Sequence, residues 1–144
     1  MIKIQIPATS ANLGAGFDAL GLALTYYNYI EMEECDKIDI TAADGLDIPT
    51  DERNLIYISA KDLFAVCGKK LEGLKLIQTS NIPMARGLGS SSACIIAGLV
   101  GANKMLGDPL TKDDLVDLAA QIEGHPDNTA PALLGGIVTA VFDG

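Results

Sequence analysis

The sequence predicts an α+β domain, and three observations carry this prediction. Segments with strand character come first, helical segments dominate the second half, and a strand returns at the end, in the order β, β, β, α, β, α, α, β. The length of 144 residues suits a single domain. The hydrophobic share of 49%, with only 5% aromatic residues, allows a sizeable core built mostly from aliphatic side chains.

The first three strands are predicted from alternation and composition. Ile2, Ile4 and Ile6 alternate with polar residues, which is the spacing of a strand with one buried face, and Pro7 ends that regular run. Two segments rich in β-branched and aromatic residues predict the next strands. The predicted loop and the two strands after it are residues 8–21, 22–34 and 37–44.

The middle of the chain is predicted to contain two helices around one strand. Asn54 can cap a helix that runs through residues 55–67, and Gly68 lies just past its end. Residues 74–82 have the composition of a strand. Residues 90–106 are apolar nearly all round, which predicts a buried helix.

A last helix and a last strand complete the order. Thr111, followed by two aspartates, starts a helix that continues through residues 115–124, because negative charge in a first turn favours the helix dipole. Residues 124–136 form a predicted loop, and residues 136–143 a predicted strand. The chain stops one residue later, so we expect it to be a piece of a longer protein.

Charge and composition argue against several classes of partner. The net charge of −9 disfavours nucleic acid, because phosphate contacts dominate that affinity. No segment approaches the ~20 apolar residues that cross a bilayer, and the N-terminus lacks a secretory signal, so we expect a cytoplasmic protein with no membrane partner. Cys35, Cys67 and Cys94 form no CxxC pair, so neither a disulfide framework nor a zinc site is expected. We interpret Cys94 as a small core residue.

The sequence IPMARGLGSSSACIIAG, residues 82–98, combines the features of an anion site. Pro83 breaks a strand, and Gly87 and Gly89 allow a ligand to approach the backbone closely. Three serines then open a helix, whose first N–H groups lack intrahelical partners and carry partial positive charge. Phosphate is the ligand that such a site usually binds. The alternative is a plain turn with Ser90 as the N-cap, but the convergence of these residue types favours phosphate.

Two better-known phosphate motifs do not fit. The loop is not a Walker A motif, because no lysine follows Gly89 until Lys104. Upstream, Gly14, Gly16 and Ala19 give GxGxxA, with Glu33 and Glu34 near the spacing of a dinucleotide fingerprint. That fingerprint requires a helix after the glycines, whereas the following residues favour a strand. A Rossmann dehydrogenase is therefore a weak alternative.

Two polar clusters flank this loop in the sequence. The first, PATSANLGAGFD, contains Thr9, Ser10, Asn12 and Asp18, and either turn chemistry or a polar ligand pocket explains it.

The second cluster is EGHPDN, residues 123–128, which contains the only histidine of the chain. A carboxylate here could bind magnesium, which favours oxygen ligands and bridges phosphates. The C-terminus of a helix disfavours an acid, so we interpret Glu123 as placed for something other than stability.

Together, the motifs PMARGLGSSSA, PATSANLGAGFDALG and EGHPDNTAPALLGG resemble those of the GHMP kinases. That family includes galactokinase, homoserine kinase, mevalonate kinase and phosphomevalonate kinase. The resemblance runs from Ile4 to Gly136, and the two flanking motifs are closest to the homoserine kinases of the family. It implies that residues 1–144 are the N-terminal, ATP-binding domain, with the C-terminal domain outside this chain. The implied fold is like domain 2 of ribosomal protein S5, a mixed sheet with helices packed on one face.

The resemblance implies a reaction in which ATP and L-homoserine give ADP and O-phospho-L-homoserine, on the route to threonine. The implied cofactors are ATP and Mg²⁺. Ser91 and Glu123 match the metal ligands and count as catalytic, although three consecutive serines leave Ser90 and Ser92 open as alternatives. The residues that match nucleotide contacts are Asn54, Pro83, Met84, Ala85, Arg86, Gly87, Leu88, Gly89, Ser90, Ser91, Ser92 and Ala93.

The resemblance also implies an amino-acid site. Asn12, Asp18, His125 and Asn128 match substrate-binding residues, and Asp18 can take the substrate ammonium through a charge-assisted hydrogen bond. Asp18 is either a catalytic base or an orienting group, and we prefer the orienting role.

Several alternatives remain open. Another small-molecule GHMP kinase, such as a mevalonate-type kinase, would share the phosphate loop. A non-catalytic S5-like domain that binds RNA would share the fold, but the charge of −9 argues against it. A homodimer is compatible with the sequence, which does not fix the oligomeric state. The isolated chain is expected to bind nucleotide, with its turnover left open.

Overall fold

The computed structural model describes residues 1–11, 21–82, 90–124, 133 and 138–141. Within these residues the elements follow the predicted order of strands and helices, which confirms the α+β class. They are β1 (Ile2–Ala11), β2 (Gly21–Cys35), β3 (Ile38–Ala42), α1 (Leu55–Val66), β4 (Gly73–Ser80), α2 (Ser90–Met105), α3 (Lys112–Glu123) and β5 (Val138–Val141).

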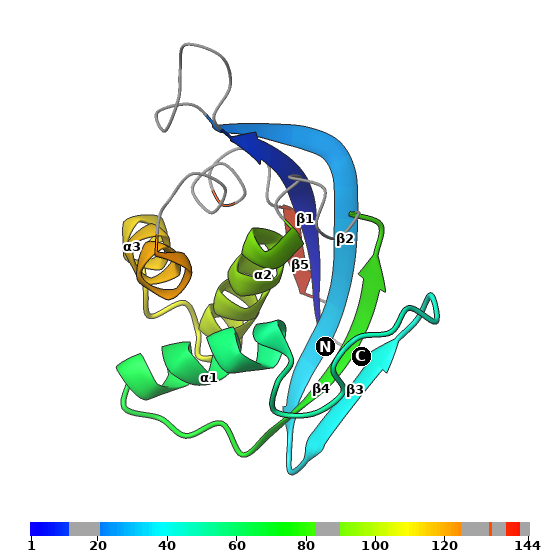
Figure 1. The fold of residues 1–144 in the computed structure, drawn as a ribbon. Coiled ribbons are helices and arrows are strands. Elements are labelled where there is room, and N and C mark those ends of the chain that lie inside the picture. The colour runs from blue at the N-terminus through cyan, green and yellow to red at the C-terminus, as the bar shows by residue number, and fades with distance from the viewer. Residues whose placement is uncertain (12–20, 83–89, 125–132, 134–137, 142–144) are drawn as a thin grey trace.

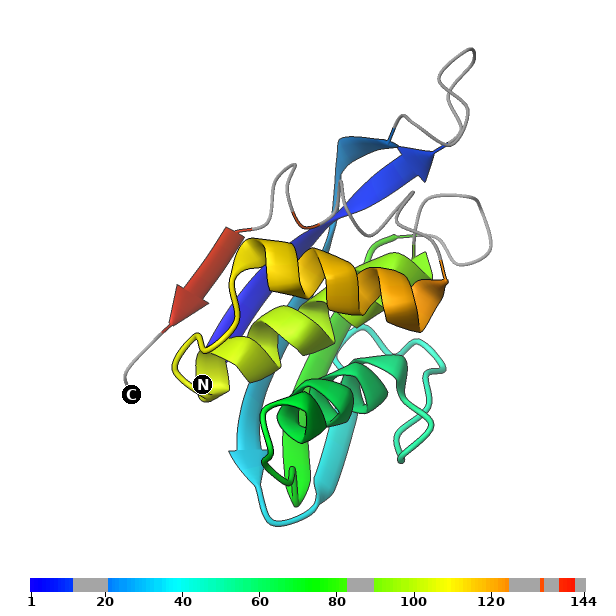
Figure 2. The same cartoon turned by 90° about the vertical axis from the view of Figure 1, so that its left-hand side faces the viewer.

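The strands form one mixed sheet in the order β3-β4-β2-β1-β5. β3 runs parallel to β4, and every other neighbouring pair is antiparallel. The three helices lie together on one face of this sheet, as Figures 1 and 2 show. α2 is the central helix, with α1 on one side, α3 on the other and β1 and β2 beneath it. The predicted mixed sheet with helices on one face is therefore confirmed.

The alternation of residue types along the strands explains which face is covered. Ile2, Ile4 and Ile6 point into the core and are 7% exposed or less, as the alternating pattern predicts. The opposite face carries charged pairs, with Lys3 Nζ 3.2 Å from Glu31 Oε1. Exposed ion pairs of this kind contribute little stability. Most of the stabilisation of the sheet therefore comes from the apolar face that packs against the helices.

β1 is longer than the sequence indicates. The predicted loop begins at residue 8, whereas the strand continues to Ala11. A shift in the pairing register between Pro7 and Thr9 marks an irregularity at the proline. Proline cannot donate to the ladder, and an irregularity of this kind accommodates it without ending the strand.

The predicted N-cap Asn54 is confirmed, and Thr111, which was predicted to start a helix, is the N-cap of α3. Asn54 Oδ1 accepts hydrogen bonds from the backbone nitrogens of Ile56 and Tyr57, at 2.9 and 3.4 Å. Thr111 forms a capping box in which its hydroxyl accepts from Asp114 N at 3.2 Å and Asp114 Oδ2 accepts from Thr111 N at 3.0 Å. α3 therefore begins at Lys112, directly after Thr111, in agreement with the predicted start of this helix.

The turn between α2 and α3 is held by one buried side chain. Asn103 is 4% exposed, and its amide exchanges two hydrogen bonds of 3.0 Å with the backbone of Leu110. These two hydrogen bonds hold the turn that leads α3 back along α2. The end of α3 consequently returns to the start of α2, where the candidate site lies (Figure 2).

Candidate functional site

A carboxylate and two hydroxyls meet where α2 begins and α3 ends. Ser92 Oγ donates a hydrogen bond to Glu123 Oε2 at 2.9 Å, and Ser91 Oγ donates to Glu123 Oε1 at 3.3 Å. Each oxygen of the carboxylate thus has one serine partner, from residues more than 30 positions away in the chain. The fold therefore assembles the two sequence-predicted metal ligands, Ser91 and Glu123, into one cluster.

The two helix dipoles act on Glu123 in opposite directions. Its own helix ends there, with Gly124 in the left-handed conformation at φ 93°, and the C-terminus of a helix disfavours negative charge. The same carboxylate faces the N-terminus of α2, which favours negative charge. Glu123 therefore also stabilises the start of α2, a role that the sequence interpretation did not include.

The cluster has the donor chemistry that magnesium prefers. Mg²⁺ binds oxygen at 2.0–2.1 Å in an octahedron, so two adjacent ligands lie about 2.9 Å apart. The 3.3 Å between Ser91 Oγ and Glu123 Oε1 is close to that spacing. Among the described residues, no three His, Cys, Asp or Glu side chains gather into a metal site. Mg²⁺ usually keeps water molecules and phosphate oxygens as ligands, so a site with only a few protein ligands fits this ion.

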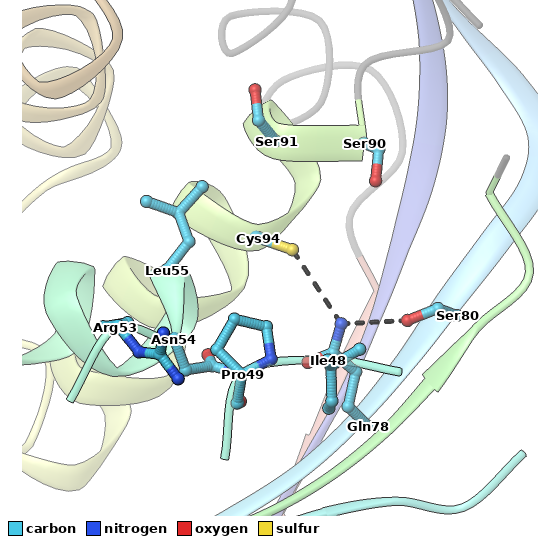
Figure 3. Close-up of a pocket in the computed structure, with 10 residues that line it drawn as sticks. All are labelled: Ile48, Pro49, Arg53, Asn54, Leu55, Gln78, Ser80, Ser90, Ser91 and Cys94. Carbon is cyan, nitrogen blue, oxygen red and sulfur yellow. Dashed lines mark hydrogen bonds between the residues drawn. The ribbon is translucent and has the colours of Figure 1, made fainter. Parts of the chain in front are cut away.

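A pocket of about 300 Å³ begins beside this cluster. The pocket lies between the segment that precedes α1, the end of β4 and the first turn of α2 (Figure 3). Its size is at the lower end of the roughly 300–1,000 Å³ typical of small-molecule sites. The lining residues are Ile48, Pro49, Arg53, Asn54, Leu55, Gln78, Ser80, Ser90, Ser91 and Cys94.

Asn54 lines the pocket, but its side chain already serves the fold. Its Oδ1 caps α1, and its Nδ2 donates to the carbonyl oxygen of Pro49 at 2.9 Å. The residue is 3% exposed. Asn54 therefore shapes the pocket wall by joining the segment at Pro49 to the start of α1. Its predicted contact with a nucleotide stays a prediction.

Arg53 brings no free cation to the pocket. Its Nε donates to both carboxylate oxygens of Asp51, at 2.9 and 3.1 Å, and its guanidinium also lies 2.9 Å from Asp51 Oδ2. The bond to Arg53 lowers the pKa of the Asp51 carboxyl, which keeps the pair ionised.

Sequence reasoning assigned Cys94 to the core alone and missed six residues that line the pocket: Ile48, Pro49, Arg53, Leu55, Gln78 and Ser80. Gln78 follows Leu74 and Leu76 at the same inward spacing on β4, so a polar residue on the buried face was the available signal. Cys94 does pack against the core, and it also lines the pocket. Burial raises the pKa of its thiol to about 11, so the thiol is protonated at neutral pH.

The other predicted site residues divide into two groups. Ser90 and Ser91 line the pocket, Ser91 and Ser92 contact Glu123, and Ala93 is buried in the core at 1% exposed. The remaining predicted residues lie outside the described part of the chain: Asn12, Asp18, Pro83, Met84, Ala85, Arg86, Gly87, Leu88, Gly89, His125 and Asn128.

A family model described as "GHMP kinases N terminal domain" matches residues 54–136, which is more than half of the chain. The match covers the pocket helix α1, the serine-bearing helix α2 and the carboxylate at the end of α3. The chain belongs to the GHMP kinase family. Its predicted family membership is therefore confirmed.

Several relatives within the GHMP kinase family are homoserine kinases. The chain is 51% identical to the homoserine kinase of Carboxydothermus hydrogenoformans, over 99% of this chain and 48% of that protein. It is 48% identical to the homoserine kinase of Clostridium acetobutylicum, over 99% of this chain and 49% of that protein. The chain spans about half the length of the curated relatives it matches.

Solved structures of the GHMP kinase family share the fold. The homoserine kinase of Cytophaga hutchinsonii superposes with a TM-score of 0.81 at 33% identity, covering 96% of this chain and 47% of that one. The mevalonate kinase of Methanococcus jannaschii gives 0.72 at 20% identity, covering 97% of this chain and 53% of that one, a likeness of fold alone. None of the helices described here has the length and apolar character needed to cross a membrane.

Proposed function

We propose that residues 1–144 are the N-terminal, nucleotide-binding domain of a kinase that converts L-homoserine and ATP to O-phospho-L-homoserine and ADP, in threonine biosynthesis. The observation that carries the proposal is the contact of Ser91 and Ser92 with Glu123 at the N-terminus of α2, beside a pocket of about 300 Å³. The 51% identity to a homoserine kinase supports the choice of acceptor. A C-terminal domain would complete the enzyme.

In this proposal the nucleotide extends from the pocket to the N-terminus of α2. Its base occupies the pocket between α1 and β4, and its phosphates reach the start of α2. The first N–H groups of α2 and the predicted loop Pro83–Ala93 donate to the phosphate oxygens. Ser91 and Glu123 would hold Mg²⁺, which would neutralise phosphate charge.

The protein contributes mainly position and charge. Phosphoryl transfer has a loose transition state, so catalysis depends on alignment and electrostatic stabilisation. The two serine hydroxyls hold the Glu123 carboxylate in place before a ligand arrives, so little reorganisation is needed during reaction. The N-terminus of α2 faces the negative charge of the transferred group.

The acceptor site is proposed from the flanking motifs. Asn12, Asp18, His125 and Asn128 bind L-homoserine, and Asp18 orients it through the ammonium group. The substrate hydroxyl then attacks the γ-phosphorus directly, the bond from this phosphorus to the β,γ-bridging oxygen breaks, and ADP leaves. The hydroxyl proton passes to an oxygen of the transferred phosphoryl group. We further propose a cytoplasmic enzyme, for which a homodimer is one assembly.

A coupled ADP-release assay on the complete polypeptide that contains this chain tests the proposal. Homoserine, mevalonate and galactose are supplied in parallel with ATP and Mg²⁺. We expect ADP release that depends on homoserine. Turnover with mevalonate instead would favour the mevalonate-type alternative, and a salt-dependent RNA shift without turnover would favour the non-catalytic one.

A further inference from the structure

Gln78 carries a buried acceptor with no partner. The residue lies on the inward face of β4 and is 5% exposed. Its Nε2 donates to Ser80 Oγ at 2.9 Å and lies 4.0 Å from Cys94 Sγ. Its Oε1 is the only buried side-chain nitrogen or oxygen in the described part of the chain without a hydrogen bond. An orphaned acceptor of this kind requires an explanation, because burial without a partner is unfavourable.

The position of Gln78 in the pocket supplies that explanation. The side chain lines the pocket together with the two groups that its Nε2 approaches, as Figure 3 shows. Those contacts occupy the donor end of the amide, and its acceptor end is buried without a partner. A ligand in the pocket that offers an N–H group would satisfy Oε1.

The pocket has three regions with different chemistry. Ile48, Pro49 and Leu55 form an apolar wall that suits the face of a flat ring. Ser90 and Ser91 stand at the end nearest the proposed phosphates. Gln78 belongs to a polar edge on β4, so a ring on the apolar wall can turn its own polar edge toward the amide.

We propose that Gln78 is a specificity-determining residue that selects a 6-aminopurine nucleotide by accepting a hydrogen bond at Oε1 from the exocyclic amino group. This inference rests on the proposed function. A 6-oxopurine places a carbonyl oxygen at the same position, so two acceptors would face each other. Sites that hydrogen-bond one ligand group reject analogues that lack it, because their own buried group stays unpaired.

The test is a competition experiment on the full protein with a fluorescent ATP analogue. ATP and ITP are titrated against wild type, Gln78→Met and Gln5→Met. Gln78→Met keeps the side-chain length and removes the amide. Gln5→Met makes the same substitution on β1, where Gln5 alternates with the inward-facing Ile4 and Ile6.

We expect wild type and Gln5→Met to bind ATP at least tenfold more tightly than ITP, and Gln78→Met to bring the ratio to within about threefold, as lost discrimination requires. An unchanged ratio in Gln78→Met, or a wild-type preference for ITP, would overturn the inference and leave the proposed function standing. Absence of any nucleotide binding by wild type would overturn both.

Two further measurements keep the inference testable if Gln78→Met does not fold. Purine ribonucleoside triphosphate, which lacks the amino group, should bind wild type as weakly as ITP does. Gln78→Leu should lose the preference for ATP as Gln78→Met would. Binding of the purine nucleotide as tightly as ATP would contradict the assigned hydrogen bond.

Discussion

Asn28 on β2 accepts a hydrogen bond through Oδ1 from the backbone nitrogen of Ile82, at 2.9 Å, across 54 positions of the chain. Both residues are 2% exposed. Ile82 is the last described residue before the predicted phosphate loop. The centre of the sheet therefore fixes the point from which that loop departs.

Asn28→Leu should weaken both the fold and the binding of nucleotide. The substitution leaves the Ile82 N–H buried without a partner, which costs about 1–3 kcal/mol. Because the lost bond anchors the loop, we expect KM for ATP to rise several-fold. Thermal unfolding and steady-state kinetics measure the two effects. Asn81→Leu, at an exposed neighbouring position, is the control and should leave KM unchanged.

Glu123→Gln should reduce kcat strongly and raise the Mg²⁺ concentration that half-saturates the enzyme. Loss of one preorganised electrostatic group costs about 10²–10³ in kcat. Asp117→Asn, on the exposed face of α3, is the matched control. Rates and Mg²⁺ dependence equal to wild type in Glu123→Gln would remove this residue from the metal site.

Comparing Ser91→Ala with Ser92→Ala should identify the metal ligand. Ser91 is exposed at the pocket, whereas Ser92 is 1% exposed and forms the shorter bond to Glu123. We expect Ser91→Ala to lower kcat and Ser92→Ala mainly to lower stability, by about 1 kcal/mol. Kinetics and denaturant titration of both variants give the answer, and the reverse pattern would assign the ligand to Ser92.

Gly98→Ala should destabilise the protein by pushing α1 away from α2. A Cβ at this position would meet the carbonyl oxygen of Ile56 and would lie 2.8 Å from Ser59 Cβ. Overpacking of this kind costs about 1–3 kcal/mol, and a backbone oxygen cannot move as a side chain can. Gly101→Ala, which meets the flexible end of Met32, should cost less in the same thermal denaturation experiment.

The Cys94 thiol should react slowly at neutral pH and be protected by nucleotide. Burial raises its pKa from 9.0 to about 11, which lowers the thiolate population about a hundredfold at pH 7–8. Iodoacetamide labelling followed by mass spectrometry should show the rate rising with pH up to about 11. Labelling that ignores added ATP would contradict the placement of nucleotide in this pocket.

The raised pKa of Cys94 also predicts how the stability of the fold depends on pH. Because the folded-state pKa is raised, folding favours the protonated thiol, and this contribution is complete below pH 9 and is lost as pH rises through 11.

Local signals explain why most of the fold could be predicted. Asn54 and Thr111 cap helices through bonds to residues two or three positions away, so short sequence patterns specify them. Pro7 misled the prediction because pairing with β2 continues past the proline to Ala11, and this pairing overrides the local tendency of proline to end a strand. Tertiary pairing of that kind leaves no mark within one segment.

The cluster of serines and carboxylate was predicted because motifs contain its residues. Ser91 and Glu123 stood within two recognisable motifs, and the structure brings them together. Gln78 stood within an ordinary strand, and its significance depends on a pocket formed by segments distant in sequence. An unpaired buried oxygen is a property of three-dimensional packing, so no sequence pattern predicts it.

The parallel pairing of β3 with β4 has a consequence for how this pocket can be altered. Parallel neighbours need a crossover, and the stretch from Ala43 to Asn54 is the part of that crossover that forms one wall of the pocket. It is fastened to β4 at its start, where Asp44 Oδ2 accepts from Ser80 N at 2.7 Å, a bond that lowers the pKa of the carboxyl. Its other end is fastened at Asn54. Lengthening or shortening the segment between these two anchors would resize the pocket while leaving the sheet intact, so loop length offers a route to redesigning which ligands the domain admits.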